Sequence, residues 1–395
     1  MSCLVIKNDG IGDLVLSSGL IGGLAREFAG ALDLVTCEQN REIAEMIPGV
    51  RRVLYVSRDD LRFSPQWGKW GILRGGGSPA DACVLRQIRD TPYDLAISLR
   101  RFIRQNTLVI MKNVRAKRKY CAWQFPTNAT PRQARKASRG WSHYQGPQEV
   151  LWEPAYYKGF LHDCLGLELD SSPRLDLGSM GGAEPFGGKA VALGMAGQSG
   201  GWPETHWIAL ATELAAEGWR LGIFGGRESM AVAERIARDT GGQNHAGKLS
   251  FRETAVELRR YPYCVGSDTG LSHFATLICQ KVLVILGGGT FRRFFPWAQA
   301  LNQHIIFRGM DCFDCDWSCK HPERYCLTRI EPRNVVEQLD GMVKGAQDKE
   351  CDLNPVNERY PIGWRRSCAE DASAGPSKPQ AAVRPDARSV HGAEQ

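Results

Sequence analysis

A carboxylate beside two glycines follows the first apolar segment of the chain, in the stretch "VIKNDGIGDLV" at residues 5–15. A strand is expected before this turn and a helix over 14–28, which places Asp13 at the start of the helix, next to Gly10 and Gly12. A carboxylate here can accept hydrogen bonds from free helix amides, or it can serve as a general base at a cleft. Helix amides lower a carboxylate's pKa, so the two roles pull in opposite directions. Spacing alone leaves both open.

The turn does not match a dinucleotide-binding fingerprint. Gly10 and Gly12 fit the first two positions of G-x-G-x-x-G, but Val15 occupies the third. The glycines still permit a tight turn that clears space for a ligand. We therefore predict that Gly10 and Gly12 border a ligand site.

A second chemical candidate is the stretch "VGSDTGLSHFA" at 265–275, where a predicted strand ends and an apolar helix begins. Free backbone amides at a helix start, with the Thr269 hydroxyl, form a site for an anion. Gly270 lets a diphosphate approach the backbone. Asp268 could cap the helix or orient a ligand hydroxyl, and His273 could be a packed or a catalytic imidazole. These alternatives stay open at this point.

Two further turns are compatible with a nucleotide. Glu228 follows a strand expected at 220–226 and could accept both hydroxyls of a ribose or stabilise the next helix start. The stretch "LGGGTFRRFFP" at 286–296 ends another strand with three glycines. The residues of this turn that we expect to contact a nucleotide are Gly288, Thr290 and Arg292.

Four of the 13 cysteines are crowded into one short segment: Cys312, Cys315, Cys319 and Cys326. Four thiolates at this spacing can surround one tetrahedral zinc or iron ion. Such a site would be structural, because it leaves no open position for a substrate. The alternative is a loop packed by reduced thiols. The other cysteines are scattered, as in a cytoplasmic protein with reduced thiols.

Positive charge is concentrated in the first half of the chain. No acidic residue lies between Asp94 and Glu149, whereas 12 lysines and arginines fall between Arg100 and Arg139. This stretch is either a solvated basic face or a surface for a phosphorylated substrate, acidic lipid headgroups or nucleic acid. Nucleic acid is least favoured, because no nucleic-acid-binding motif accompanies the charges.

Alternating strand and helix patterns organise the chain into two doubly wound α/β units. We predict a first domain over 1–177, a Gly/Pro-rich linker at 178–189, a second domain over 190–346 and a disordered tail over 347–395. Neither an export signal nor a run of 18 apolar residues is found, so a cytoplasmic location without a membrane span is expected.

The quoted motifs resemble those of glycosyltransferase family 9, the family of the ADP-heptose–lipopolysaccharide heptosyltransferases. The resemblance rests on "IGDLVLSSGLIGGL", "SDTGLSHFAT" and C-x2-C-x3-C-x6-CL followed by "IEPRNVVEQL", and spans about residues 3–343. It implies a GT-B fold, in which two Rossmann-like domains face one another across a cleft. It further implies that the first domain binds the acceptor and the second a nucleotide-sugar, and that transfer is inverting and needs no catalytic metal.

The resemblance also implies roles for single residues. Asp13 matches the proposed base, and Glu228 falls where the family has an acidic residue for the ribose. The matches to the donor-contacting segment are Asp268, Thr269, Gly270, Leu271 and His273. The family's phosphate-contacting lysine has no counterpart between Gly194 and Trp207, where Ser199 could supply a hydroxyl instead. Arg292 and Arg293 could supply the missing charge.

The expected function is therefore transfer of a sugar, most plausibly a heptose, from an ADP-sugar to a lipopolysaccharide core. Phosphate or acid groups of that acceptor, and the cytoplasmic face of the inner membrane, would meet the basic stretch. The residues predicted to bind this acceptor are Gly10, Gly12, Arg100, Arg101 and Arg104. A protein or another surface glycan is an alternative acceptor. A nucleotide-sugar epimerase and a metal-stapled nucleic-acid-binding protein are alternatives of other classes.

Overall fold

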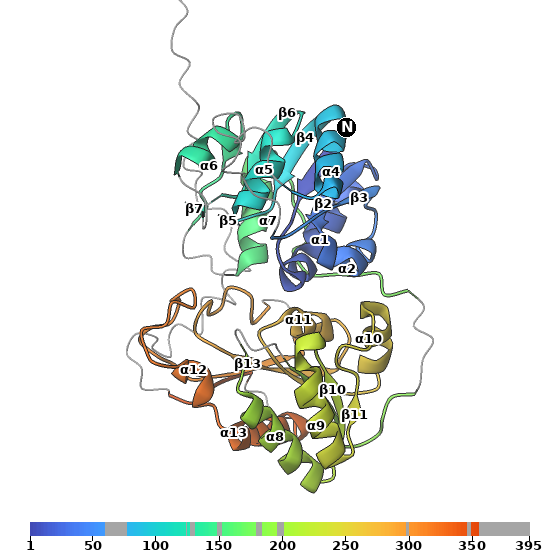
Figure 1. Ribbon diagram of the computed structural model, residues 1–395, viewed down its shortest axis with the longest axis vertical. Coiled ribbons are helices and arrows are strands. Elements are labelled where there is room, and N and C mark those ends of the chain that lie inside the picture. Colours follow the sequence, from blue (N-terminus) through green and yellow to red (C-terminus); the bar gives the residue numbers. More distant parts are fainter. Residues whose placement is uncertain are drawn as a thin grey trace, which may run out of the picture.

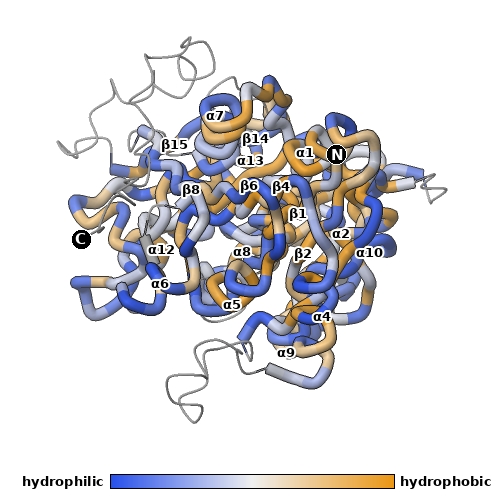
Figure 2. The backbone as a smooth tube through the Cα atoms, turned by 90° about the horizontal axis from the view of Figure 1, so that it is seen from above, coloured by the Kyte–Doolittle hydropathy of each residue, from blue (hydrophilic) through white to orange (hydrophobic). Residues whose placement is uncertain are grey.

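The computed structural model describes residues 1–59, 77–123, 125–126, 131–147, 152–178, 184–195, 201–297, 300–345 and 349–354. Two α/β domains are stacked along the longest axis of the molecule, the N-terminal one above the C-terminal one (Figure 1). Seen from above, apolar segments gather in the interior and hydrophilic ones along many outer turns (Figure 2). Ser199 and the tail beyond residue 354 lie outside the described residues.

The first domain is built on a parallel sheet. Its strands lie side by side in the order β3 (Arg52–Val56), β2 (Leu32–Cys37), β1 (Cys3–Ile6), β4 (Tyr93–Ser98), β6 (Ala116–Cys121) and β8 (Ser142–His143). Every residue of β1 is buried, as expected of a central strand covered on both faces. A short pair, β5 (Phe102–Ile103) and β7 (Phe125–Pro126), lies outside this sheet.

Helices connect these strands and cover the sheet (Figure 1). They are α1 (Ile11–Glu27), α2 (Arg41–Glu45), α4 (Pro79–Asp90), α5 (Gln105–Asn113), α6 (Pro131–Ala137) and α7 (Glu153–Leu165), with a 3-10 turn η1 (Glu38–Asn40). Helix α1 begins three residues before the predicted start at 14, so Asp13 lies inside its first turn.

The second domain repeats the plan with another parallel sheet. Its order is β11 (Gln243–Asn244), β10 (Arg220–Phe224), β9 (Ala190–Gly194), β12 (Tyr263–Ser267), β13 (Lys281–Leu286), β14 (Gln303–Phe307) and β15 (Glu350–Asp352). The helices are α8 (Glu204–Ala216), α9 (Met230–Thr240), α10 (Phe251–Leu258), α11 (Gly270–Thr276), α12 (Tyr325–Thr328) and α13 (Pro332–Val343), with a 3-10 turn η3 (Arg227–Ser229).

The expectation of a disordered tail from residue 347 onward is wrong for Glu350–Asp352, which form strand β15. Strand β15 pairs in parallel with β14 and extends the second sheet. Glu350 on this strand forms an ion pair with the buried guanidinium of Arg292. The segment is short, half-buried and polar, so its composition does not predict a strand. Pairing with the sheet edge and one ion pair stabilise it.

The order of the strands locates the places where ligands are expected. In each sheet the direction of winding reverses next to the first strand, between β1 and β4 and between β9 and β12. Ligands of such sheets bind beyond the carboxyl ends of the strands at this point. The turns there carry Asp13, Arg100 and Asp268, so both switch points contribute to one interdomain region.

Candidate active site

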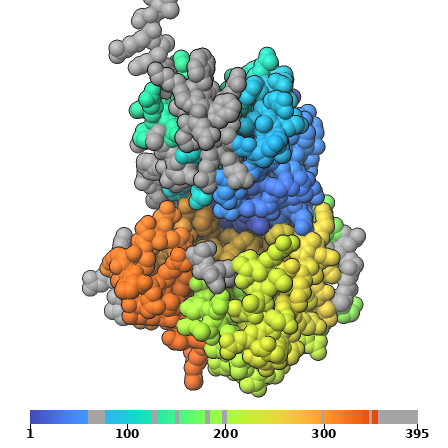
Figure 3. All heavy atoms as spheres, in the orientation of Figure 1, coloured from blue at the N-terminus to red at the C-terminus, as the bar shows by residue number. Residues whose placement is uncertain are grey.

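Two pockets lie where the domains meet, and the space-filling view shows the waist of the molecule hollowed there (Figure 3). The large pocket has a volume of about 960 Å³ and is lined by residues that include Gly10, Gly12, Asp13, Glu228, Asp268–Leu271 and His273. The small pocket, about 260 Å³, is lined by residues that include Asp9, Asp13, Arg100, Arg101, Arg104, Glu153 and Arg293. Asp13 borders both pockets.

The Asp13 carboxylate lies at the third position of helix α1, and its Oδ2 accepts a hydrogen bond from the Gly10 backbone amide at 3.0 Å. The capping and cleft-facing roles therefore coincide in one side chain. Burial, and then repulsion from Asp9, raise its pKa to about 6. These effects outweigh Lys7 and Arg100, which act in the opposite direction. The lowered pKa that helix amides alone would produce is thus not found, and the group is suited to accept a proton near neutral pH.

A cluster of buried charges surrounds this carboxylate. Asp9 Oδ2 lies 2.9 Å from Lys7 Nζ and 3.0 Å from an Arg100 guanidinium nitrogen. Glu153, at the start of α7, accepts a hydrogen bond from Arg293 Nε of the second domain at 3.3 Å. The Glu153 amide also donates to the Arg293 carbonyl at 3.0 Å, so this contact ties the domains together beside Asp13.

The carboxylates of Asp9, Asp13 and Glu153 approach one another within 4.8 Å, a separation that could suit a cation. Basic side chains already supply the positive charge that a cation would bring. Lys7 and Arg100 neutralise Asp9, and Arg293 neutralises Glu153. A divalent ion would have to compete with these neighbours. The cluster therefore fits a network of ion pairs better than a metal site.

On the opposite wall, Asp268 follows β12 and borders the large pocket with the start of α11. Burial, followed by repulsion from Asp13, raises the pKa of Asp268 to about 7. His273 is 3% exposed and its Nδ1 accepts a hydrogen bond from Trp297 Nε1 at 3.0 Å. Its ring stacks on Phe295, and burial lowers its pKa to about 3, so the imidazole is neutral and its Nε2 carries the proton.

The far end of the large pocket is formed by the turn after β10. Glu228 lies on η3 and lines the pocket together with Phe224, His245 and Lys248. The imidazole of His245 stacks on Phe224 with ring centroids 4.8 Å apart. A carboxylate, flat rings and a basic side chain are suited to a ribose, a nucleobase and a phosphate.

A pair of glycines lets helices of the two domains approach one another closely. A methyl group built on Gly12 would lie 2.8 Å from His273 Cδ2 and 3.3 Å from Gly270 Cα. Gly270 in turn faces Ile11 and the backbone of Gly12. Gly12 therefore permits contact between the two helices. Asp13 lies on α1, and α11 begins shortly after Asp268.

Several predicted site residues lie elsewhere. Arg292 points to β15, and Gly288 is covered by the Phe313 ring, so neither lines the large or the small pocket. Thr290 lines the small pocket rather than the large one. The basic stretch is divided as well, because Lys117 on β6 pairs with Asp94 at 2.7 Å, whereas the three predicted arginines line the small pocket.

The sequence did not indicate Arg58 or Glu153 as site residues, and it named Arg293 only together with Arg292. Arg58 borders both pockets, and Glu153 with Arg293 links the domains. Glu153 lay in the gap between predicted elements and carried no motif. Arg293 stood beside Arg292 in the sequence, and spacing could not tell which of the two would face the cleft. The position of Arg58 directly after β3 is the one signal that could have indicated it.

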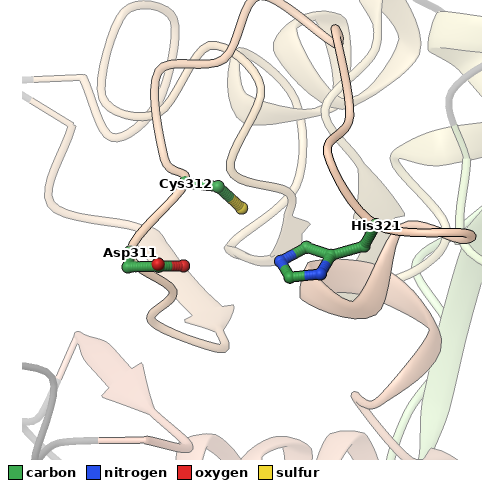
Figure 4. Close-up of side chains that lie close together, drawn as sticks. All are labelled: Asp311, Cys312 and His321. Carbon is green, nitrogen blue, oxygen red and sulfur yellow. The ribbon is translucent and has the colours of Figure 1, made fainter.

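The cysteine loop, residues 309–328, lies beside the strand end of β13. Among the described residues, no three of its four predicted thiol ligands come within 4.8 Å of one another. A different group does so, namely Asp311, Cys312 and His321, with the Cys312 thiol and the His321 ring turned toward one another (Figure 4). Cys312 thus belongs to the predicted set and to the observed group. Burial raises the pKa of the Cys326 thiol despite a hydrogen bond from the Gly288 amide.

Two Rossmann-like domains that face one another across a cleft define the GT-B fold. Comparison with solved structures agrees. Escherichia coli ADP-heptose lipopolysaccharide heptosyltransferase II superposes with a TM-score of 0.60 at 15% identity, covering 87% of this chain and 99% of that one. E. coli heptosyltransferase WaaC with ADP-2-deoxy-2-fluoro heptose gives 0.51 at 18% identity, covering 87% and 100%.

Sequence comparison finds relatives in the family that the motifs resemble. The model of glycosyltransferase family 9 (heptosyltransferase) matches residues 192–319. Lipopolysaccharide heptosyltransferase 1 of Pseudomonas aeruginosa is 25% identical over 369 residues, which cover 87% of this chain and 98% of that protein. Both matches are similarities to glycosyltransferase family 9, the family that the motifs resemble. No described helix is long and apolar enough to span a bilayer.

Proposed function

We propose that this enzyme transfers a heptose from ADP-heptose to a lipopolysaccharide-core acceptor with inversion at the anomeric carbon. One observation carries the proposal: Asp13 stands on the wall shared by the two pockets, with a pKa of about 6. A base at this position faces an acceptor hydroxyl in the small pocket and the anomeric carbon of a donor in the large pocket. The names of the similar proteins support heptose as the sugar.

The donor would occupy the large pocket. Glu228 would accept the ribose hydroxyls, and the diphosphate would meet the backbone amides at Thr269–Leu271. The His273 Nε2–H is fixed as a donor by the Trp297 hydrogen bond and lies 3.9 Å from Asp268. Asp268 would then orient hydroxyls of the transferred sugar, and Arg58 would contribute positive charge at the junction of the pockets.

The acceptor would enter the small pocket, where arginines suit phosphate or carboxylate groups of a lipopolysaccharide core. Asp13 would take the proton of the attacking hydroxyl as that oxygen reaches the anomeric carbon from the face opposite ADP. The charge that grows on the leaving diphosphate would be met by amides and basic groups that are already in place. In the proposed reaction the protein's own groups carry every step, without a catalytic metal. A protein or another surface glycan remains the alternative acceptor.

Calorimetric titration with ADP-heptose and with matched UDP- and GDP-sugars tests the donor. We expect the ADP-sugar to bind at least tenfold more tightly than the others. In a separate assay, mass spectrometry should detect heptose transfer to a heptose-free lipopolysaccharide core. An α-to-β or β-to-α change at the new linkage, read by NMR, would establish inversion. Preference for a different nucleotide would contradict the proposed donor.

The Glu228→Gln substitution should weaken donor binding on the order of tenfold, because an amide offers one acceptor oxygen where the carboxylate offers two to the ribose hydroxyls. Calorimetry with ADP measures the change without any dependence on the sugar or the acceptor. Glu234→Gln is the matched control, since Glu234 is an exposed carboxylate on α9 outside both pockets. Equal loss in both variants would remove the ribose role from Glu228.

We further propose that the cysteine loop holds one structural zinc or iron ion. The donor set of thiolates, with Asp311 and His321 close to Cys312, is compatible with either metal. Elemental analysis should find about one equivalent of metal in the wild type and in Cys83→Ser, a variant of an exposed thiol on α4. Cys312→Ser should lose most of it. Wild-type protein without zinc or iron would end the proposal.

A further inference from the structure

The cysteine loop contributes two side chains to the small pocket, although it belongs to the second domain. Asp316 and Trp317 line this pocket opposite the arginines that follow β4. The family resemblance led to the expectation that the first domain binds the acceptor. In the structure the wall of the small pocket comes from both domains.

The three consecutive glycines after β13 explain how the loop reaches this place. A methyl group on Gly289 would lie 2.3 Å from Trp317 Cδ2, and one on Gly288 would lie 2.1 Å from Phe313 Cδ1. Both rings therefore rest directly on the glycine backbone. The glycines predicted to cradle a nucleotide instead form a floor for the rings of the cysteine loop.

Backbone hydrogen bonds fasten the loop to the same floor. The Asp314 amide donates to the Gly288 carbonyl at 2.7 Å, and the Asp316 amide donates to the Gly289 carbonyl at 2.9 Å. Asp314, Asp316 and Trp317 all adopt positive φ, at 63°, 47° and 61°. Three non-glycine residues in this costly conformation are tolerated only where surrounding contacts determine them. The loop presents Asp316 and Trp317 in a set position.

Asp316 differs in charge environment from the other acids of the small pocket. Asp9 is paired with Lys7 and Arg100, and Glu153 is paired with Arg293. Asp316 is exposed and, within the described part of the chain, forms no ion pair. Its carboxylate can accept hydrogen bonds from hydroxyl groups, while Trp317 supplies an apolar wall beside it.

We propose that Asp316 and Trp317 form an acceptor subsite for the hydroxyl-rich face of a sugar whose acidic group meets the arginines. This inference deepens the proposed function and rests on the acceptor entering the small pocket. The acceptor would then contact both domains, and its binding would favour the arrangement in which Asp13 faces the donor. The subsite discriminates among acceptors and leaves the ADP contacts unchanged.

The test measures binding of deacylated, heptose-free lipopolysaccharide core oligosaccharide by calorimetry in the presence of ADP. Asp316→Asn should weaken this binding on the order of tenfold while ADP affinity stays within twofold. Asp314→Asn is the matched control, because it makes the same change at positive φ in the same loop but outside the pocket. It should bind the oligosaccharide like the wild type.

Trp317→Leu provides an independent readout that keeps an apolar side chain over the glycine floor. We expect weaker oligosaccharide binding together with unchanged ADP affinity. Unchanged oligosaccharide binding in both Asp316→Asn and Trp317→Leu would overturn the subsite, as would a parallel loss of ADP binding. If the wild type binds the oligosaccharide and the variants weaken it, yet no heptose is transferred, the subsite stands and the proposed reaction fails.

Discussion

Replacing Asp13 by asparagine should lower kcat by about a thousandfold, because general-base catalysis by a positioned side chain typically contributes 10² to 10⁴. Asparagine preserves the size of the side chain and the hydrogen bond from Gly10, but it cannot take a proton. ADP-heptose affinity should stay within about threefold of the wild type, because Asp13 is assigned no contact with the nucleotide. Rapid-quench transfer assays and calorimetry measure the two quantities separately.

The pH dependence of the same reaction identifies the group. In the wild type, kcat/KM should rise with pH through about 6, as the Asp13 carboxylate loses its proton and becomes a competent base. His273 does not contribute to this limb, since burial lowers its pKa to about 3. Asp268, with a pKa of about 7, titrates close to this range, so the Asp13→Asn variant is needed to assign the limb. Asp13→Asn should abolish the limb. A variant that keeps near-normal turnover, or the same pH limb, would remove Asp13 from the mechanism.

The stability of the variant separates a chemical defect from misfolding. The pKa of Asp13 in the folded protein lies above its ordinary value of 3.8, so the folded state binds the proton more tightly than the unfolded chain does. The ionised carboxylate therefore opposes folding above about pH 6, and this effect is absent below about 3.8. Asp13→Asn should not lower the melting temperature at pH 8. A large drop there would attribute lost activity to unfolding.

Gly12→Ala should reduce kcat/KM on the order of a hundredfold without destabilising the first domain. The added methyl would lie 2.8 Å from His273 and would force α1 and α11 apart. A misplacement of about 1 Å between reacting groups can reduce the rate by this much. Alanine is otherwise favourable in a helix, so the substitution should not weaken α1 itself.

The same helix supplies the control for this substitution. A methyl on Gly22 would find its nearest neighbours in Pro48 at 3.6 Å, an ordinary contact. Gly22→Ala should therefore keep wild-type kcat/KM and an equal or higher melting temperature. Full activity in Gly12→Ala would show that the close approach of the two glycines is unnecessary for transfer.

The acidic residues at strand ends could be predicted from the sequence because their position depends on local order. Asp13, Glu228 and Asp268 each follow a buried apolar run and begin a helix, and parallel strands bring such turns to the same edge of a sheet. The structure accordingly brings all three to the large pocket. The direction in which the pKa of Asp13 shifts could not be predicted this way, because the shift depends on burial between domains and on the nearby Asp9.

The arginines after β13 show where prediction from spacing ends. Arg292 and Arg293 are adjacent and chemically identical, yet one pairs with Glu350 on the sheet edge and the other with Glu153 across the cleft. Both partners are distant in sequence, so local pattern carries no information about the choice. The same applies to the three glycines, which suggested a phosphate loop and instead support Trp317 and Phe313.

The sequence by itself determined the two doubly wound domains, the resemblance to glycosyltransferase family 9 and the acidic turns, because each depends on periodicity or on motifs within a few residues. Tertiary structure alone decided which of those residues face the cleft and what their pKa values are. Lys7, Asp9 and Glu153 acquire their roles only when buried beside one another, and Asp316 reaches the small pocket only through the glycine floor. The reason is that burial and the proximity of charges depend on segments distant in sequence, which come together only when the chain folds.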